Sequence, residues 1–259
     1  VTGKIIVNNL LESEDVLATA NALRKMGVPI NKLSNNKWEI FGSGIGSLSG
    51  TNNILDMGNS GTGARLLMGL VAGSDVEATF IGDQSLSKRP MKRIISPLIE
   101  TGATIENFNN DTLPIKIKGS KITLPIEYES TVASAQVKSS ILLAGLSSIG
   151  TTSIIEPSLS RDHTERMLKY FGAKIETIKL KNSKWKIILE GIPSLKPLDI
   201  NVPSDPSSAS FPIVSALITP NSKVKVTNVC VNELRTGLFK TLIEMGANIK
   251  FTNSREING

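Results

Sequence analysis

The chain has 259 residues, of which 40% are hydrophobic and 20% charged, and its formal net charge is +6. This balance is typical of a globular protein and excludes a disordered chain, while no run approaches the roughly 18 apolar residues of a membrane span. A single cysteine, Cys230, rules out an internal disulfide, and a single histidine, His163, argues against a zinc centre. We therefore expect a cytoplasmic protein.

The positive charge permits binding to nucleic acid, a membrane surface or small anions. Only 4% of the residues are aromatic, and we find no basic run with the interleaved aromatic residues that stack on bases. We therefore expect no nucleic-acid or membrane partner, and interpret most lysines as surface residues.

The first candidate site is a glycine-rich turn. A strand-like Ile54-Leu55 leads into Gly58-Asn59-Ser60-Gly61, and an apolar pattern over 66–72 predicts a helix. A helix that starts in such a turn directs unpaired N–H groups toward one point, where an anion is stabilised. A plain turn at a helix start explains the same residues.

The second candidate is Arg89, which we place at the start of a helix with Lys88 and Pro90. Cations are unfavourable there because the helix dipole is positive at that end. Either a bound anion or an internal salt bridge accounts for this arginine.

Two further candidates follow. Ser134-Ala135-Gln136 precedes a predicted helix over 137–146, where Ser134 is expected to cap the helix and Gln136 can donate to a bound oxygen. Arg161 is expected at the start of another helix. Neighbouring His163 is expected to cap that helix or face solvent, not to act in catalysis.

An internal repeat organises these motifs. A Gly followed by a small residue recurs at Gly27, Gly102, Gly172 and Gly246, each after a helical pattern, as expected of a left-handed helix cap before a strand. Three serines, expected to begin helices, are spaced by 74 residues. The pattern predicts α/β units with the order βαβαββ, packed about a common axis. Hairpin strands flank 182–183, and further strands are expected at 225–229 and 247–251. The serines are Ser60, Ser134 and Ser208.

The repeat also predicts the domains. Residues 1–202 are expected to form nearly three units of a substrate-binding domain that lacks its first strands, and 203–259 the truncated first unit of a second domain. Pro203 and Pro206 bracket the predicted crossover. The chain begins within a strand-like run and ends after another, so we interpret it as an internal fragment.

As a set, the motifs at 58–65, 89–91, 134–139, 161–165 and 205–209 resemble the 5-enolpyruvylshikimate-3-phosphate synthase family. The resemblance runs along the whole chain, and its Arg-Asp-His-Thr form is similar to a bacterial group that includes glyphosate-insensitive enzymes. It implies an inverse α/β barrel fold, and transfer of the enolpyruvyl group of phosphoenolpyruvate to the 5-hydroxyl of shikimate 3-phosphate. It also implies no metal or other cofactor, and a monomer when complete.

The resemblance assigns residues one by one. Gly61 and Arg89 match phosphoenolpyruvate-binding positions, with Asn59 nearby, and Gln136 matches a residue that touches both substrates. The positions at shikimate 3-phosphate are Ser134, Ala135 and Arg161. Because insensitive members carry Ala in place of Gly61, we expect the complete enzyme to be glyphosate-sensitive. The family's catalytic Lys and Asp have no match in 1–259, so the fragment is expected to be inactive.

Two alternatives remain. The related enolpyruvyltransferase that acts on UDP-N-acetylglucosamine shares the fold and uses a loop cysteine, whereas Cys230 lies in an apolar pattern that favours core packing. The other alternative is a non-enzymatic module that binds RNA or anions.

Overall fold

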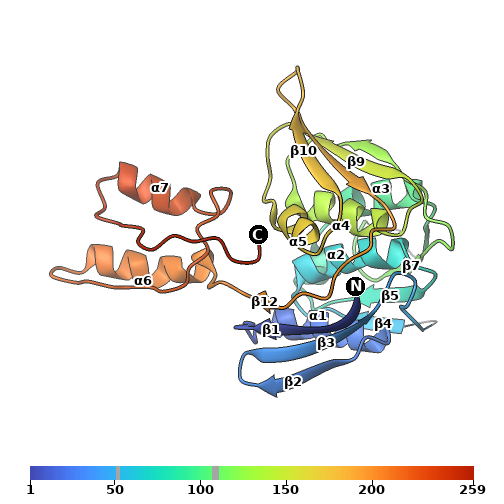
Figure 1. Ribbon diagram of the computed structural model, residues 1–259, viewed down its shortest axis with the longest axis horizontal. Helices are drawn as coiled ribbons and strands as arrows, with labels where there is room; N and C mark the ends of the chain where they lie inside the picture. Colours follow the sequence, from blue (N-terminus) through green and yellow to red (C-terminus); the bar gives the residue numbers. More distant parts are fainter. Residues whose placement is uncertain (51–52, 107–110) are drawn as a thin grey trace.

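The computed structural model describes residues 1–50, 53–106 and 111–259 (Figure 1). The described part is an α/β structure with three four-stranded mixed sheets. In each sheet one edge strand runs parallel to its neighbour, and the two remaining strands continue antiparallel as a hairpin.

Two of the sheets come from continuous segments with the predicted order βαβαββ. The first has the strand order β4-β5-β7-β6, and the second β8-β9-β11-β10. The first segment comprises β4(Asn53–Asp56), α2(Gly61–Ala72), β5(Glu77–Ile81), the short 3-10 helix η1(Leu86–Lys88), α3(Lys92–Glu100), β6(Thr104–Glu106) and β7(Ile115–Lys118). The second comprises β8(Glu127–Glu129), α4(Ala135–Gly145), β9(Thr151–Glu156), α5(His163–Tyr170), β10(Ile175–Lys179) and β11(Trp185–Glu190).

The remaining sheet joins distant parts of the chain. Its parallel edge pair consists of β1 and β12, in which Val7 lies opposite Ile200. The N-terminal residues therefore form a third, similar sheet only with the help of a strand that follows the second unit. Its elements are β1(Thr2–Asn8), α1(Glu14–Lys25), β2(Ile30–Ser34), β3(Lys37–Ser43) and β12(Ile200–Asn201).

The predicted helix caps are confirmed. All four glycines of the repeated phrase have positive φ, between 88° and 97°, and each lies two residues beyond the end of a helix. Only glycine adopts this left-handed conformation without steric cost. The predicted hairpin at 182–183 is confirmed as well, between β10 and β11. These glycines are Gly27, Gly102, Gly172 and Gly246.

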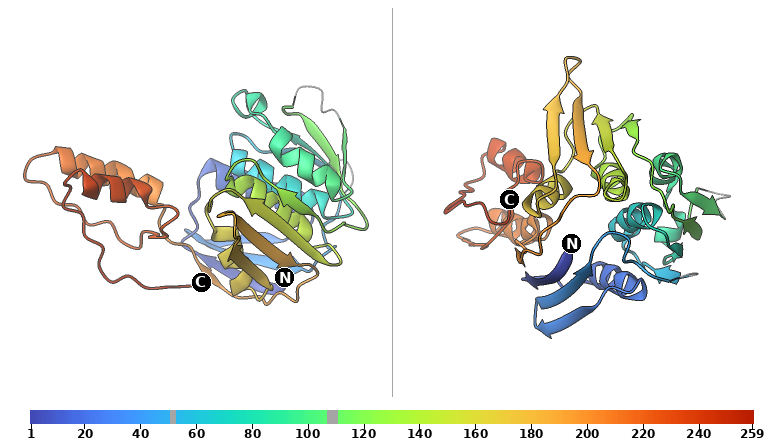
Figure 2. Two further views of the ribbon diagram at one scale, coloured as in Figure 1. Left: turned by 90° about the horizontal axis from the view of Figure 1, so that it is seen from above. Right: turned by 45° about the vertical axis from the view of Figure 1, so that its right-hand side comes forward.

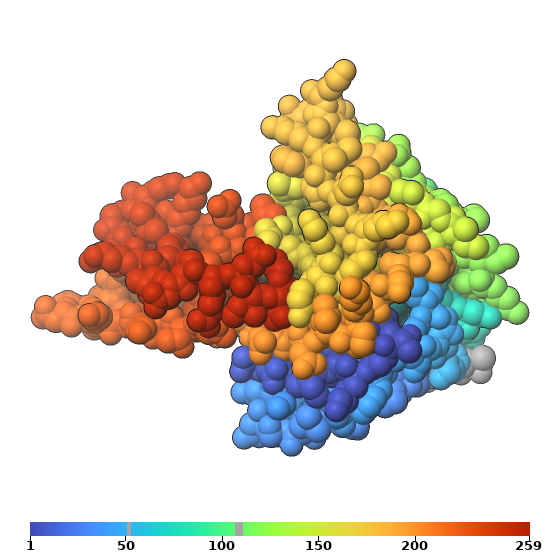
Figure 3. All heavy atoms as spheres, viewed as in Figure 1, coloured from blue at the N-terminus to red at the C-terminus, as the bar shows by residue number. Residues whose placement is uncertain are grey.

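The C-terminal residues form a lobe beside the three sheets, with α6(Pro206–Ile218) and α7(Gly237–Glu244) (Figures 1 and 3). The strands predicted at 225–229 and 247–251 are not formed; Val229 makes only an isolated bridge with Ser204. Ser208 does not begin its helix, since Asp205 is the N-cap and accepts a 2.7 Å hydrogen bond from the Ser208 N–H. Apolar side chains of the lobe are exposed, including Phe211, Ile218 and Met245.

The helices face the interior and the sheets lie outside them (Figure 2). At the centre α2 packs against α4, and Gly69 of α2 and its C-cap residue Gly73 set the distance between them. A Cβ added to Gly69 would lie 2.1 Å from the Ser140 carbonyl oxygen, and one added to Gly73 would lie 2.6 Å from that of Ala144. The two contacts advance in the same direction along both helices, so the N-termini of α2 and α4 lie side by side.

No helix in the described ranges is long and apolar enough to span a membrane. Within the same ranges, no three His, Cys, Asp or Glu side chains gather as they would around a metal ion.

Candidate functional site

The first part of the site is the turn between β4 and α2. Gly58 adopts a positive φ of 53° and its N–H donates to Asp56 Oδ1 at 2.9 Å, which turns the chain sharply. Ser60 is the N-cap residue of α2, although its side chain makes no capping bond. The first turn of α2, which begins at Gly61, points its N–H groups out of the helix end, and that end carries a partial positive charge.

Arg89 reaches this turn from the end of η1. Its Nη2 donates to Asn59 Oδ1 at 2.7 Å and to Ser85 Oγ at 3.2 Å. Asn59 is oriented in turn because its Nδ2 donates to Asp83 Oδ2 at 2.6 Å. Arg89 lies three residues before α3 and does not begin that helix, contrary to the prediction. The hydrogen bond to Asn59 positions its guanidinium.

Arg65 adds a second positive charge beside Gly61. A Cβ at Gly61 would lie 3.0 Å from Arg89 Nη1 and 3.1 Å from Arg65 Nη1. Partial burial lowers the pKa of Arg65, and the positive charges of Arg89 and Arg93 lower it further. In the described part of the chain neither Arg65 nor Arg89 forms an ion pair, so the salt-bridge explanation of Arg89 is wrong there. Clustered cations of this kind are stabilised by a bound anion.

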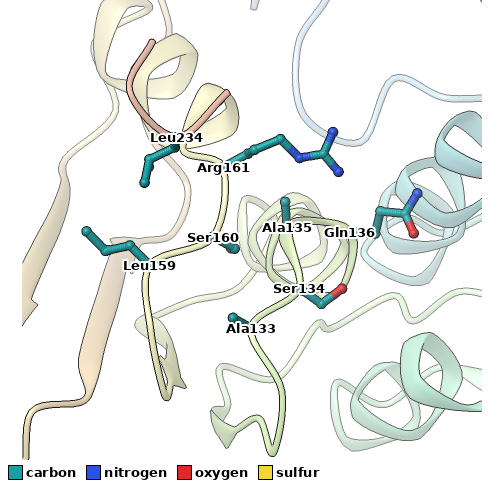
Figure 4. A pocket seen from close by; sticks show the side chains of 8 residues that line it. All are labelled: Ala133, Ser134, Ala135, Gln136, Leu159, Ser160, Arg161 and Leu234. Atoms are coloured by element: carbon teal, nitrogen blue, oxygen red, sulfur yellow. The ribbon is translucent and has the colours of Figure 1, made fainter. Parts of the chain in front are cut away.

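The second part of the site is a cavity of about 360 Å³ at the N-terminus of α4 (Figure 4). Ser134 caps α4 as predicted, accepting a hydrogen bond from the Val137 N–H at 3.5 Å. Four of the predicted site residues share this cavity. Its lining consists of Ala133, Ser134, Ala135, Gln136, Leu159, Ser160, Arg161 and Leu234.

Arg161 enters the cavity from the loop between β9 and α5. It precedes the helix by two residues, since Asp162 is the N-cap of α5 and His163 its first residue. Figure 4 shows the Arg161 side chain extending past Ala135 toward the side on which Gln136 lies. Arg161 is exposed and, within the described residues, forms no ion pair. The cavity therefore combines a free guanidinium with the positive end of α4.

The two parts meet at Gln136. Its Nε2 donates to Thr62 Oγ1 at 2.9 Å, which links the first turns of α4 and α2. The predicted site residues thus form two groups, Asn59, Gly61 and Arg89 on α2 and its neighbours, and Ser134, Ala135, Gln136 and Arg161 on α4 and its neighbours.

His163 does not line the cavity, and it does not cap its helix, because the N-cap residue is Asp162. Partial burial lowers its pKa, and the charges of Arg235, Arg161 and Arg166 add to this effect against the opposing influence of Asp162. Cys230 also lies outside the cavity lining; it is only partly buried, and its N–H donates to the Ser204 carbonyl.

Several residues of the site were not predicted, among them Thr62, Arg65 and Leu234. Thr62 and Arg65 lie on α2 within the glycine-rich motif. Thr62 is identified by its hydrogen bond with Gln136 of α4, and Arg65 by its place beside Gly61 and its hydrogen bond to the Pro90 carbonyl oxygen. Leu234 comes from the C-terminal lobe, which is anchored at this place because Asn232 Nδ2 donates to Asp162 Oδ1 at 2.6 Å. The spacing of Ser208 from Ser134 predicted that the lobe repeats the unit, but not that it reaches the cavity.

Comparisons with known proteins show which family the chain is similar to. The family model "EPSP synthase (3-phosphoshikimate 1-carboxyvinyltransferase)" matches residues 1–258. The chain is 51% identical over 257 residues to a 3-phosphoshikimate 1-carboxyvinyltransferase of Parvibaculum lavamentivorans, and 49% identical to one of Acidiphilium cryptum, with 99% of this chain covered in each case. It spans 57% and 58% of those relatives.

A solved structure gives the same result. The structure of EPSP synthase from Acinetobacter baumannii is 43% identical and superposes with a TM-score of 0.87, covering 99% of this chain and 57% of its own. Similarity of this extent in both sequence and structure goes beyond a shared fold. The chain belongs to the EPSP synthase (3-phosphoshikimate 1-carboxyvinyltransferase) family.

Proposed function

We propose that the protein carrying this chain transfers the enolpyruvyl group of phosphoenolpyruvate to the 5-hydroxyl of shikimate 3-phosphate. The observation that carries the proposal is the pair of adjoining positive sites joined by Gln136 and Thr62. A reaction between two anionic substrates requires two such sites whose ligands come into contact.

Phosphoenolpyruvate is assigned to the site around Gly61. Arg65 and Arg89 flank it on both sides, and a carboxylate or a phosphate can accept paired hydrogen bonds from a guanidinium. Asn59 holds Arg89 in place before the ligand arrives, which reduces the entropy that binding costs.

Shikimate 3-phosphate is assigned to the cavity at α4. Its phosphate is matched by the hydroxyl of Ser134, the end of α4 at Ala135 and the guanidinium of Arg161, and the hydroxyls of its ring are matched by Gln136. The Gln136 amide then lies between the two substrates.

In the reaction the 5-hydroxyl gives up its proton as its oxygen bonds to C2 of phosphoenolpyruvate, and C3 takes up a proton. Phosphate then leaves C2 and C3 loses a proton, which restores the double bond. The arginines described above stabilise the carboxylate and phosphate charges along this path. We propose that the 259 residues bind these anions without turning them over, on the expectation that the family's catalytic Lys and Asp have no match among them.

We also propose that the complete enzyme is glyphosate-sensitive, although its Arg-Asp-His-Thr motif is similar to that of the insensitive group. Gly61 leaves open the space between Arg65 and Arg89 that an Ala methyl group would occupy.

We further propose the domain division 1–202 and 203–259, with the exposed apolar faces of α6 and α7 belonging to a second domain.

Isothermal titration of the full-length protein with shikimate 3-phosphate tests the substrate assignment. We expect saturable binding at physiological salt that Arg161→Ala weakens by at least tenfold. In parallel titrations, UDP-N-acetylglucosamine or a short single-stranded RNA replaces shikimate 3-phosphate, and the affinities are compared. Preference for the sugar nucleotide would support the related transferase, and preference for RNA would support a nucleic-acid module.

A further inference from the structure

Lys138 is a completely buried lysine one helical turn beyond Ser134 on α4. Its Nζ lies 2.7 Å from Glu165 Oε1, 3.1 Å from Glu156 Oε1 and 3.3 Å from the Ser160 carbonyl oxygen. An ammonium group has three N–H donors, and here three acceptors surround it. The lysine therefore joins α4 to α5, to the end of β9 and to the loop that follows β9.

Ser160 is held by all of its polar groups. Its N–H donates to Glu156 Oε1 at 2.9 Å, its hydroxyl donates to Glu156 Oε2 at 2.8 Å, and its carbonyl accepts from Lys138. Ser160 lines the cavity and directly precedes Arg161. The backbone that carries the Arg161 side chain is thus attached to α4 through two buried charges.

This buried cluster is a costly way to hold a fold together. Burial raises the pKa of Glu165 in spite of the opposing charge of Lys138, and Glu165 Oε2 has no hydrogen-bond partner in the described part of the chain. Apolar side chains of similar volume commonly stabilise such a site as well or better. Unlike apolar contacts, however, these bonds are directional and they converge on one residue of the cavity wall.

We propose that Lys138 and Glu156 are positioning residues for ligand binding: they fix the Ser160-Arg161 backbone against the N-terminus of α4, so that Arg161, Ser134 and Gln136 present one preformed site. The inference rests on the proposed function for the identity of the ligand, shikimate 3-phosphate. Lys138 and Glu156 do not line the cavity and act through Ser160 and Arg161.

Hydrogen exchange in the full-length protein tests the positioning without any ligand. Glu156→Gln keeps the size of the side chain but removes its charge, and we expect about fivefold faster exchange of the Ser160 amide. Lys138→Met, combined with Glu165→Gln to neutralise one of the two carboxylates that would lose their partner, should give about tenfold faster exchange. The control is Lys116→Met, which also removes a lysine between two glutamates, Glu77 and Glu106, but at a partly exposed position in the β4-β5-β7-β6 sheet.

Titration with shikimate 3-phosphate supplies the second measurement, in a double-mutant cycle with Arg161→Ala. If Glu156 acts through Arg161, then Glu156→Gln should raise Kd about fivefold in the wild-type background and leave it unchanged when Arg161 is already alanine. Equal weakening in both backgrounds, or an unchanged exchange rate of the Ser160 amide, would overturn the inference alone. Absence of binding by the wild-type protein would overturn the proposed function and this inference with it.

Discussion

Gln136 donates a hydrogen bond to the hydroxyl of Thr62 at 2.9 Å, although the two residues are 74 positions apart in the chain. This separation is the period of the internal repeat, so the bond joins equivalent helix starts in successive units. It is possible because Gly69 and Gly73 let α2 approach the backbone of α4 closely. The fold thereby brings two anion sites together at the ends of two parallel helices.

Thr62→Val should weaken this link while preserving the shape of the side chain. Gln136 would lose its acceptor, and we expect the affinities for phosphoenolpyruvate and shikimate 3-phosphate each to fall about fivefold, the usual effect of one hydrogen bond. Isothermal titration of the full-length protein measures both. The control Thr177→Val alters an exposed strand position. An unchanged affinity for both ligands would show that the bond does not organise the site.

Gly61→Ala should change the selectivity of the site between Arg65 and Arg89. The new methyl would lie within 3.1 Å of guanidinium nitrogens of both Arg65 and Arg89, closer than nonbonded carbon and nitrogen atoms ordinarily approach. We expect a rise of at least tenfold in the glyphosate concentration that halves activity, with a smaller rise in KM for phosphoenolpyruvate. Steady-state inhibition of both proteins measures this. A wild-type enzyme unaffected by millimolar glyphosate would contradict the prediction.

Asp83→Asn should disturb Arg89 from a distance. Asp83 accepts hydrogen bonds from the Leu86 N–H at 2.7 Å and from Asn59 Nδ2 at 2.6 Å, and these bonds hold the pKa of its carboxyl below the usual value. An amide at position 83 can turn its NH2 toward Asn59, which then loses its acceptor and its orientation. We expect about tenfold weaker phosphoenolpyruvate binding. Asp75→Asn, at an exposed position, is the control, and equal affinities in the two variants would count against the chain of contacts.

The pKa of His163 should report the charge near Arg161. It can be measured without overlapping signals, because His163 is the one histidine of the sequence. Partial burial and the arginines Arg235, Arg161 and Arg166 hold its pKa below the ordinary value of 6.5. An anion bound at Arg161 would offset part of that positive charge, so shikimate 3-phosphate should raise the pKa of His163. NMR titration of the imidazole measures it, and Arg161→Gln should raise the pKa and abolish the response to ligand.

The same shift predicts a pH dependence of stability. Since the folded pKa of His163 lies below the unfolded one, the unfolded chain takes up the proton first as the pH falls. The free energy of unfolding should therefore decrease as the pH falls through 6.5 and level off below the folded pKa. Urea unfolding of wild type and His163→Gln compares the slopes, and equal slopes between pH 5 and 7 would contradict the assignment.

Local signals predicted much of the fold. The glycine caps, the hairpin at 182–183 and the unit βαβαββ depend on residues close together in the chain, and Gly102 illustrates this with its φ of 96°. The prediction of strands at 225–229 and 247–251 was wrong. A strand requires a hydrogen-bonded neighbour, and Val229 forms only an isolated bridge with Ser204. The pairing of β12 with β1 was likewise invisible in local sequence.

The site was predicted as separate motifs and not as an arrangement. Ser134 and Gln136 were predicted because they can cap a helix or donate to a ligand at its N-terminus. Arg89 and Arg161 were predicted because a cation is unfavourable at the start of a helix. Two hydrogen bonds depend on tertiary packing, which no local pattern reveals. They join Gln136 to Thr62 and Lys138 to the Ser160 carbonyl oxygen.

Phosphate release tests the central claim most directly. The full-length protein is mixed with phosphoenolpyruvate and shikimate 3-phosphate, and inorganic phosphate is measured against mixtures that lack either substrate. We predict release only when both substrates are present, reduced by at least tenfold in Arg89→Ala and Arg161→Ala. Phosphate release that requires UDP-N-acetylglucosamine in place of shikimate 3-phosphate, or none with either acceptor, would contradict the account.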